Sequence, residues 1–206
     1  MTELERDRER AWALVREWTA GESLRRHMLA VEAAMRVYAR HFGEDEETWA
    51  VTGLLHDLDY ERYPVMDGTG HPFKAVDFLR EQGYPEWMLR AILSHADYSG
   101  VLRESPVEHA LFAVDELTGF IGAVALIRPS KRVADVDATA VRKKMKDKRF
   151  AAAISREDLL QGAEELGLEF DAHIDNTVTA LVSVADQLGL AGTEALASAG
   201  KEGTNA

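Results

Sequence analysis

Residues 54–59 read Leu54-Leu55-His56-Asp57-Leu58-Asp59, an apolar run interrupted by ionisable side chains. The adjacent pair His56-Asp57 is its informative part, because ionisable groups are costly to bury without partners. A divalent metal ion satisfies both side chains directly, since imidazole and carboxylate are ligands for Zn, Fe, Mn and Co. A single His-Asp pair is common in proteins, so the prediction of a metal site depends on the segments around it.

The segment before this run has the apolar spacing of one helical face. Gly43 is the expected end of that helix. No long segment alternates between apolar and polar residues as a half-buried strand does, so we predict an all-α fold. The apolar residues of the helical face are Leu24, Met28, Val31, Met35, Tyr38 and Phe42.

Prolines, glycines and apolar periodicity divide the remaining chain into further predicted helices. Pro72, Pro85 and Pro106 each stand where a first-turn proline opens a helix. The other predicted helices cover residues 3–19, 46–59, 72–82, 85–97, 106–127, 156–166 and 170–188.

Pro129 marks a break after which the composition changes. Residues 128–149 hold nine basic and three acidic residues, a net charge of +6 within a chain of net charge −12. We predict a helical core over residues 1–127. A basic loop and C-terminal helices over 128–190 are expected to pack on this core, and a flexible tail is expected over 191–206.

The composition excludes several classes of protein. A net charge of −12 in 206 residues argues against a stable nucleic-acid complex. The absence of cysteine excludes disulfides, thiolate metal ligands and a cysteine nucleophile. The N-terminus is too charged for a signal peptide, and the most apolar stretch, 110–127, contains Asp115 and Glu116. We expect a cytoplasmic protein without a membrane partner; the sequence leaves open whether it forms a homo-oligomer.

Candidate metal ligands recur beside the apolar faces of five consecutive predicted helices. Each is an imidazole or carboxylate that would need a partner if buried. In chain order they are His27, His56, Asp57, His71, His95 and Asp115. The remaining histidines are expected on helix surfaces: His41, His109 and His173.

This order resembles the HD superfamily of metal-dependent phosphohydrolases, whose core pattern is His, then His-Asp, then Asp. The resemblance covers residues 24 to about 120, and the whole chain looks like a predicted HD hydrolase subfamily of similar length. It implies an HD-domain-like helical bundle with additional C-terminal helices. One metal would be held by His27, His56, Asp57 and Asp115. A second would take His71 and His95, as in the binuclear members, with Asp57 bridging the two ions.

The resemblance also implies hydrolysis of a small phosphorylated substrate, often a nucleotide. One or two divalent ions (Fe, Mn, Zn, Co, Ni or Mg) would activate a hydroxide. The catalytic candidates are Asp57, Asp59 and Lys74. Asp59 would either orient a ligand histidine or act as a general base. The alternatives are a mixed-valent di-iron oxygenase of the HD type, a non-catalytic nucleotide-binding HD module and a plain helical interaction module.

The basic segment 128–149 has two interpretations. One is a solvated helix face around residues 141–146. The other is an anion-recognition element, in which the loop after the sixth helix bends back toward the metals and holds a phosphate. The substrate-binding candidates are then Arg128, Ser130 and Lys131, with Lys144 as a weaker one.

Overall fold

The computed structural model describes residues 3–192, and its regular elements are helices. The predicted all-α fold is therefore confirmed. Within these residues there is no strand, only an isolated bridge between Arg132 and Ala191. Most of the predicted tail, residues 193–206, lies outside the described part of the chain.

Ten α-helices and three short 3-10 helices (η) make up the described residues. The α-helices are α1 Arg8–Trp18, α2 Glu22–Phe42, α3 Glu46–Leu55, α4 Phe73–Glu81, α5 Glu86–Ser94, α6 Pro106–Leu126, α7 Ala138–Met145, α8 Arg156–Glu165, α9 Phe170–Ser183 and α10 Ala185–Leu188. The 3-10 helices are η1 Glu3–Arg6, η2 Asp97–Ser99 and η3 Val133–Asp135.

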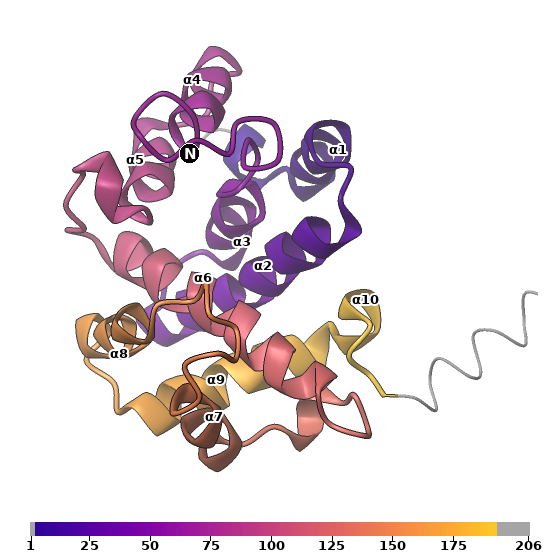
Figure 1. Cartoon of the computed structure of the whole chain (residues 1–206). Coiled ribbons are helices and arrows are strands. Elements are labelled where there is room, and N and C mark those ends of the chain that lie inside the picture. The colour runs from indigo at the N-terminus through magenta and orange to yellow at the C-terminus, as the bar shows by residue number, and fades with distance from the viewer. Residues whose placement is uncertain (1–2, 193–206) are drawn as a thin grey trace, which may run out of the picture.

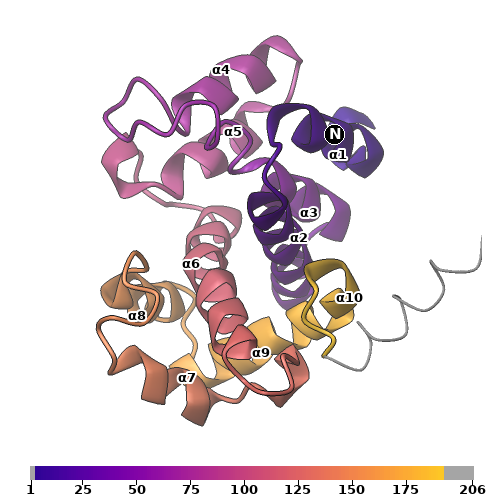
Figure 2. The ribbon, with the colours of Figure 1, turned by 45° about the vertical axis from the view of Figure 1, so that its right-hand side comes forward.

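The two longest helices, α2 and α6, pack against each other and run through the middle of the molecule (Figures 1 and 2). Around one part of this pair lie α1, α3, α4 and α5. Around the other lie α7, α8, α9 and α10. Any side chain on the facing surfaces of α2 and α6 is therefore close to the centre of the bundle.

The predicted apolar face of α2 is buried as its spacing indicated. Met28, Val31, Met35 and Tyr38 have no exposed surface, and each such burial stabilises the fold by about 1.5–3 kcal/mol. Gly43 ends the helix with a φ of 72° and donates its N–H to carbonyls of the last turn. Sequence periodicity and a glycine cap therefore account for both the position and the end of α2.

The start of α6 is fixed by local sequence. Ser105 and Glu108 form a capping box, and Pro106 occupies the first turn. The helix is long and apolar enough to cross a membrane by composition, but 61% of its most apolar window is buried inside the bundle. Such burial is typical of the core helix of a folded domain.

The C-terminal helices share the hydrophobic core of the N-terminal ones. One continuous cluster of buried residues includes Met28 of α2, Phe120 of α6, Leu159 of α8 and Ile174 of α9. The predicted units 1–127 and 128–190 thus pack on each other through apolar side chains. A domain boundary at residue 127 stays a prediction.

Four predicted helices differ from the observed ones, and one of them, predicted over 85–97, ends at Ser94. The helix predicted over 46–59 ends at Leu55, and residues 56–62 form successive turns. No glycine or proline marks this end in the sequence. The helix predicted over 3–19 is interrupted before α1, where the Asp7 side chain accepts the Arg10 N–H. The helix predicted over 170–188 is broken at Val184.

Candidate metal centre

Six side chains from five segments of the chain converge beside a cavity of about 570 Å³. We call this set the His/Asp cluster. It contains a histidine from α2, an adjacent His-Asp pair at the end of α3, histidines just before α4 and just after α5, and an aspartate from the middle of α6. In that order they are His27, His56, Asp57, His71, His95 and Asp115.

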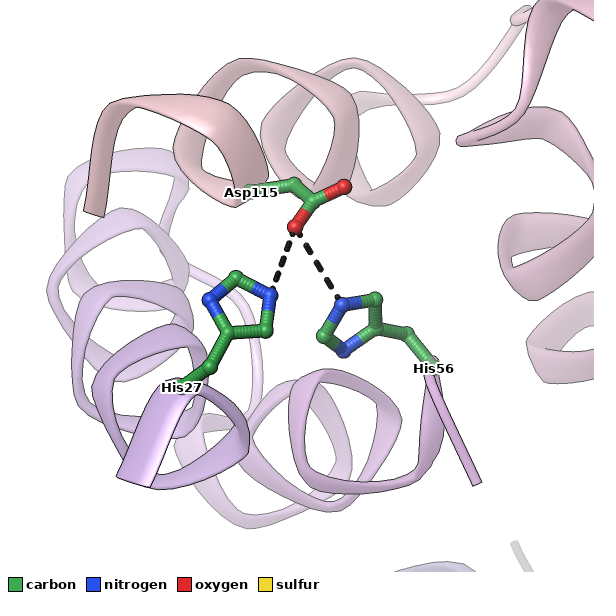
Figure 3. Close-up of side chains that lie close together, drawn as sticks. All are labelled: His27, His56 and Asp115. Carbon is green, nitrogen blue, oxygen red and sulfur yellow. Dashed lines mark ion pairs between the residues drawn. The ribbon is translucent and has the colours of Figure 1, made fainter. Parts of the chain in front are cut away.

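One half of the His/Asp cluster forms around a single carboxylate oxygen of Asp115 (Figure 3). This Oδ1 lies 2.9 Å from His27 Nε2 and 3.3 Å from His56 Nε2. Asp57 Oδ2 lies 3.6 Å from His27 Nε2 and 3.5 Å from His56 Nε2. Two imidazole nitrogens and two carboxylate oxygens therefore face a common point, at separations suited to ligands around one ion.

The other half of the cluster forms around the second oxygen of Asp57. Its Oδ1 lies 3.4 Å from His71 Nε2 and 3.9 Å from His95 Nε2. Asp57 thus directs one oxygen toward each half. Asp57 is therefore shared between the two halves of the cluster.

The buried histidines His56 and His95 are oriented by backbone carbonyls. His56 Nδ1 donates to Gly53 O at 2.7 Å, and His95 Nδ1 donates to Ile92 O at 2.5 Å. In the neutral tautomer the opposite nitrogen, Nε2, then carries a free lone pair. His56 Nε2 is buried without a hydrogen-bond partner among the described residues. A buried imidazole nitrogen without a hydrogen-bond partner fits a metal ligand once it is deprotonated.

His71 is oriented by a carboxylate instead. Its Nδ1 donates to Asp59 Oδ1 at 2.7 Å, while Asp59 Oδ2 accepts the backbone N–H of Ala75 at 2.7 Å. Asp59 has no exposed surface, and both of its oxygens are engaged. Its position favours the orienting role over that of a general base.

The buried charges of the cluster shift the pKa values of its members. Burial lowers the pKa of His56, but the Asp57 and Asp115 carboxylates outweigh burial and raise it to about 9. Burial also opposes the ionised form of Asp115, yet His56 and His27 hold the pKa of its carboxyl well below the ordinary value. Burial lowers the pKa of His95 to about 4, so its lone pair is free at neutral pH. A bound metal ion would replace the proton on His56.

The outer wall of the cavity comes from residues that were not predicted from the sequence as site residues. Tyr60 follows the 54–59 run, Tyr98 lies three residues after His95, and Glu116 follows Asp115, so proximity in the sequence was a usable signal. Asp158 comes from α8, and no sequence pattern connects it with the cluster. The polar and aromatic members of this wall are Tyr60, Asp97, Tyr98, Phe112, Glu116 and Asp158.

The predicted basic residues do not line the cavity. Each helical residue advances about 1.5 Å, so the end of α6 lies roughly 17 Å beyond Asp115. The loop after α6 is tied to the C-terminal segment by the hydrogen bond from Val133 N to Leu190 O. The catalytic role of Lys74 and the substrate-binding roles of the others stay predictions. The residues concerned are Lys74, Arg128, Ser130, Lys131 and Lys144.

The prediction that His173 lies on a helix surface is wrong. His173 has no exposed surface; its Nε2 donates to Ala113 O at 3.0 Å, and its Nδ1 accepts from the Tyr38 hydroxyl at 2.5 Å. Its spacing from Phe170 and Ile174, which share the buried face of α9, was the signal for burial. His41 is exposed as predicted.

Residues 24–119 match the family model of the HD domain. Over this range, slightly under half of its length, the chain is similar to HD domains. The matched range contains every member of the His/Asp cluster, and the HD superfamily is one of metal-dependent phosphohydrolases that bind divalent ions. No curated protein and no solved structure matches the chain.

Proposed function

We propose that this protein hydrolyses a small phosphate ester with divalent metal ions bound at the His/Asp cluster. The observation that carries the proposal is the convergence of hydrogen-bond acceptors on one place. Imidazole Nε2 atoms and the oxygens of Asp57 and Asp115 face one another at 2.9–3.9 Å. Acceptors at such distances repel one another unless a proton or a metal ion lies between them.

The cluster divides into two sets of ligands that share Asp57. The first ion would be held by His27, His56, Asp57 Oδ2 and Asp115, and the second by His71, His95 and Asp57 Oδ1. When bound, divalent ions lower the pKa of water and offset the charge of phosphoryl oxygens.

The residues of the chain hold these ligands in place and restrict access to them. Hydrogen bonds at Nδ1 direct the Nε2 atoms of His56, His71 and His95 toward the centre. His56 is fully buried behind the cluster, so a substrate reaches the ligands only from the cavity. The cavity volume of about 570 Å³ lies within the range typical of small-molecule sites.

The proposal is tested by metal analysis and phosphate release under anaerobic conditions. The chain loaded with Mn, Fe(II), Zn or Co is expected to release phosphate from p-nitrophenyl phosphate or a nucleoside monophosphate. Asp57→Ala removes the shared carboxylate, so we expect it to lose most of the bound metal and at least about 100-fold in rate. Asp175→Ala, at an exposed position of α9, is the control.

Two results would contradict the proposal. One is a normal metal content in Asp57→Ala, which would show that the metal does not bind at the His/Asp cluster. The other is consumption of O₂ with an organic alcohol or phosphonate in the absence of phosphate release, which would identify the oxygenase of the HD type.

A further inference from the structure

The cavity beside the His/Asp cluster has an acidic and aromatic wall. Besides Asp57 and Asp115, three carboxylates line it, those of Asp97, Glu116 and Asp158. Within residues 3–192 no arginine or lysine lines it. A site that receives phosphate esters normally supplies such cations, so the charge of this wall carries information about the substrate.

The charge of Asp97 is already balanced within the protein. Arg103 Nη1 lies 2.6 Å from Asp97 Oδ1, and the guanidinium covers the ring of Phe112 at 3.6 Å. Arg103 is not among the residues that line the cavity, and it pairs with both Asp97 and Glu165. Asp97 therefore has an ion-pair partner, in contrast to Glu116 and Asp158.

Glu116 and Asp158 have no ion-pair partner in the described part of the chain. Asp158 engages the structure through its backbone N–H, which donates to Ser155 Oγ at 3.2 Å. Glu116 is on α6 and Asp158 is in the first turn of α8, and these helices pack closely against each other at Gly162 and Ala113. Both side chains are partly buried and line the same cavity.

A second sign of a ligand lies in the His/Asp cluster, four histidines and aspartates of which line this cavity together with Asp115. His56 Nε2 is directed at Asp115 Oδ1 from a fully buried ring, and it has no hydrogen-bond partner among the described residues (Figure 3). The two unpaired carboxylates therefore line the same cavity as a candidate metal centre.

Two tyrosines add surfaces suited to a cation. Tyr60 and Tyr98 line the cavity with 37% and 41% of their surfaces exposed. Both are anchored at His71: the Tyr98 hydroxyl donates to His71 O at 3.0 Å, and the ring of Tyr60 lies edge-on at 5.2 Å. The face of a tyrosine ring attracts an ammonium group.

These charges select among phosphate esters. The metal ions of the proposed function would receive one phosphoryl group, but any further phosphate would face Glu116 and Asp158 without a cation. A protonated amine would instead meet two unpaired carboxylates. We infer, on the basis of the proposed function, that the substrate is a small monophosphate ester whose organic part carries an ammonium group bound by Glu116 and Asp158.

The test measures binding, so that it does not depend on turnover. Metal-loaded protein is titrated calorimetrically with 3-aminopropylphosphonate and with butylphosphonate, which have equal numbers of heavy atoms and resist hydrolysis. We expect the Kd of the amine to be about tenfold lower. Equal Kd values, no measurable binding of the amine, or tighter binding of a non-hydrolysable nucleoside triphosphate would overturn the inference.

Variants then assign the selectivity to its residues. Glu116→Gln and Asp158→Asn should each reduce the Kd ratio of the two phosphonates severalfold, with the metal content unchanged. Glu157→Gln removes an exposed charge next to Asp158 and should leave the ratio as it is. If Glu116→Gln does not fold, Asp158→Asn decides alone, and an unchanged ratio there would overturn the inference.

Phosphate release, measured in parallel from 2-aminoethyl phosphate and propyl phosphate, separates this inference from the proposed function. If phosphate is released from neither ester, the proposed function is contradicted. The Kd ratio of the two phosphonates still tests the inference separately. Equal release from both esters, together with equal Kd values, leaves the hydrolase in place and overturns only the ammonium specificity.

Discussion

At the scale of single residues, Asp59 connects the His/Asp cluster with the start of a helix. One of its oxygens accepts from His71 Nδ1, and the other accepts the N–H of Ala75 in the first turn of α4. That helix has no side-chain cap of its own, because Pro72 stands at its N-cap position. A single buried carboxylate therefore orients a candidate ligand and satisfies a free helix N–H.

We expect Asp59→Asn to weaken metal binding about 10–100-fold, because the amide NH₂ would face a donor at His71 or at Ala75. In metal-free protein the same change should lower the free energy of unfolding by about 1–3 kcal/mol. Chelator competition measures the first effect and urea denaturation the second. The exposed Asp77→Asn on α4 is the matched control, and an unchanged metal affinity would refute the orienting role.

At the scale of elements, the approach of α8 to α6 decides what lines the cavity. A Cβ atom added at Gly162 would lie 2.7 Å from the Cα of Ala113, which is closer than side chains tolerate. The absence of a side chain at Gly162 lets α8 pack directly on α6. Asp158, one turn earlier on α8, is thereby placed at the cavity wall.

We expect Gly162→Ala to lower the free energy of unfolding by about 1–3 kcal/mol, because α8 must move away from α6. Urea denaturation measures the loss. Gly122→Ala is the control on α6, since its added Cβ would have no neighbour closer than Leu190 Cδ1 at 3.9 Å. Equal stability of the two variants would show that α8 does not depend on this contact.

At the scale of the whole molecule, Arg103 ties three parts of the bundle together. Its Nε and Nη2 lie 2.8 and 2.9 Å from the Glu165 carboxylate on α8, its Nη1 binds Asp97 in η2, and its guanidinium stacks on Phe112 of α6. Burial opposes ionisation of Glu165, but Arg103 and His109 lower its pKa from 4.5 to about 2. The ionised Glu165 carboxylate thus makes a contribution to the free energy of unfolding that depends on pH.

The direction of this dependence follows from the lowered pKa. The contribution of Glu165 is fully present above pH 4.5 and is lost as the pH falls toward about 2. We expect Glu165→Gln to be less stable than wild type by about 1–2 kcal/mol at pH 7, a value reduced for partial solvent exposure. The difference should shrink at pH 3 in urea denaturation of metal-free protein. Glu164→Gln is the exposed control; a difference that is the same at both pH values would contradict the assignment.

The sequence by itself determined the helical class, most helix starts and ends, and the identity of the candidate ligands. These depend on local features: the spacing of Met28, Val31 and Met35, the glycine at position 43, and a fixed order of histidines and aspartates. Such features act over a few residues, or recur as a pattern, and can be read without knowing what packs against them.

Only the tertiary structure decided where α3 ends, that His173 is buried, and which side chains surround the cavity. The basic residues after α6 carry a local charge reversal, yet none of them is among the residues that line the cavity. Asp158 comes from a distant part of the chain and lines the cavity because α8 packs against α6. The environment of a side chain is set by contacts between segments distant in sequence, and local patterns contain no record of those contacts.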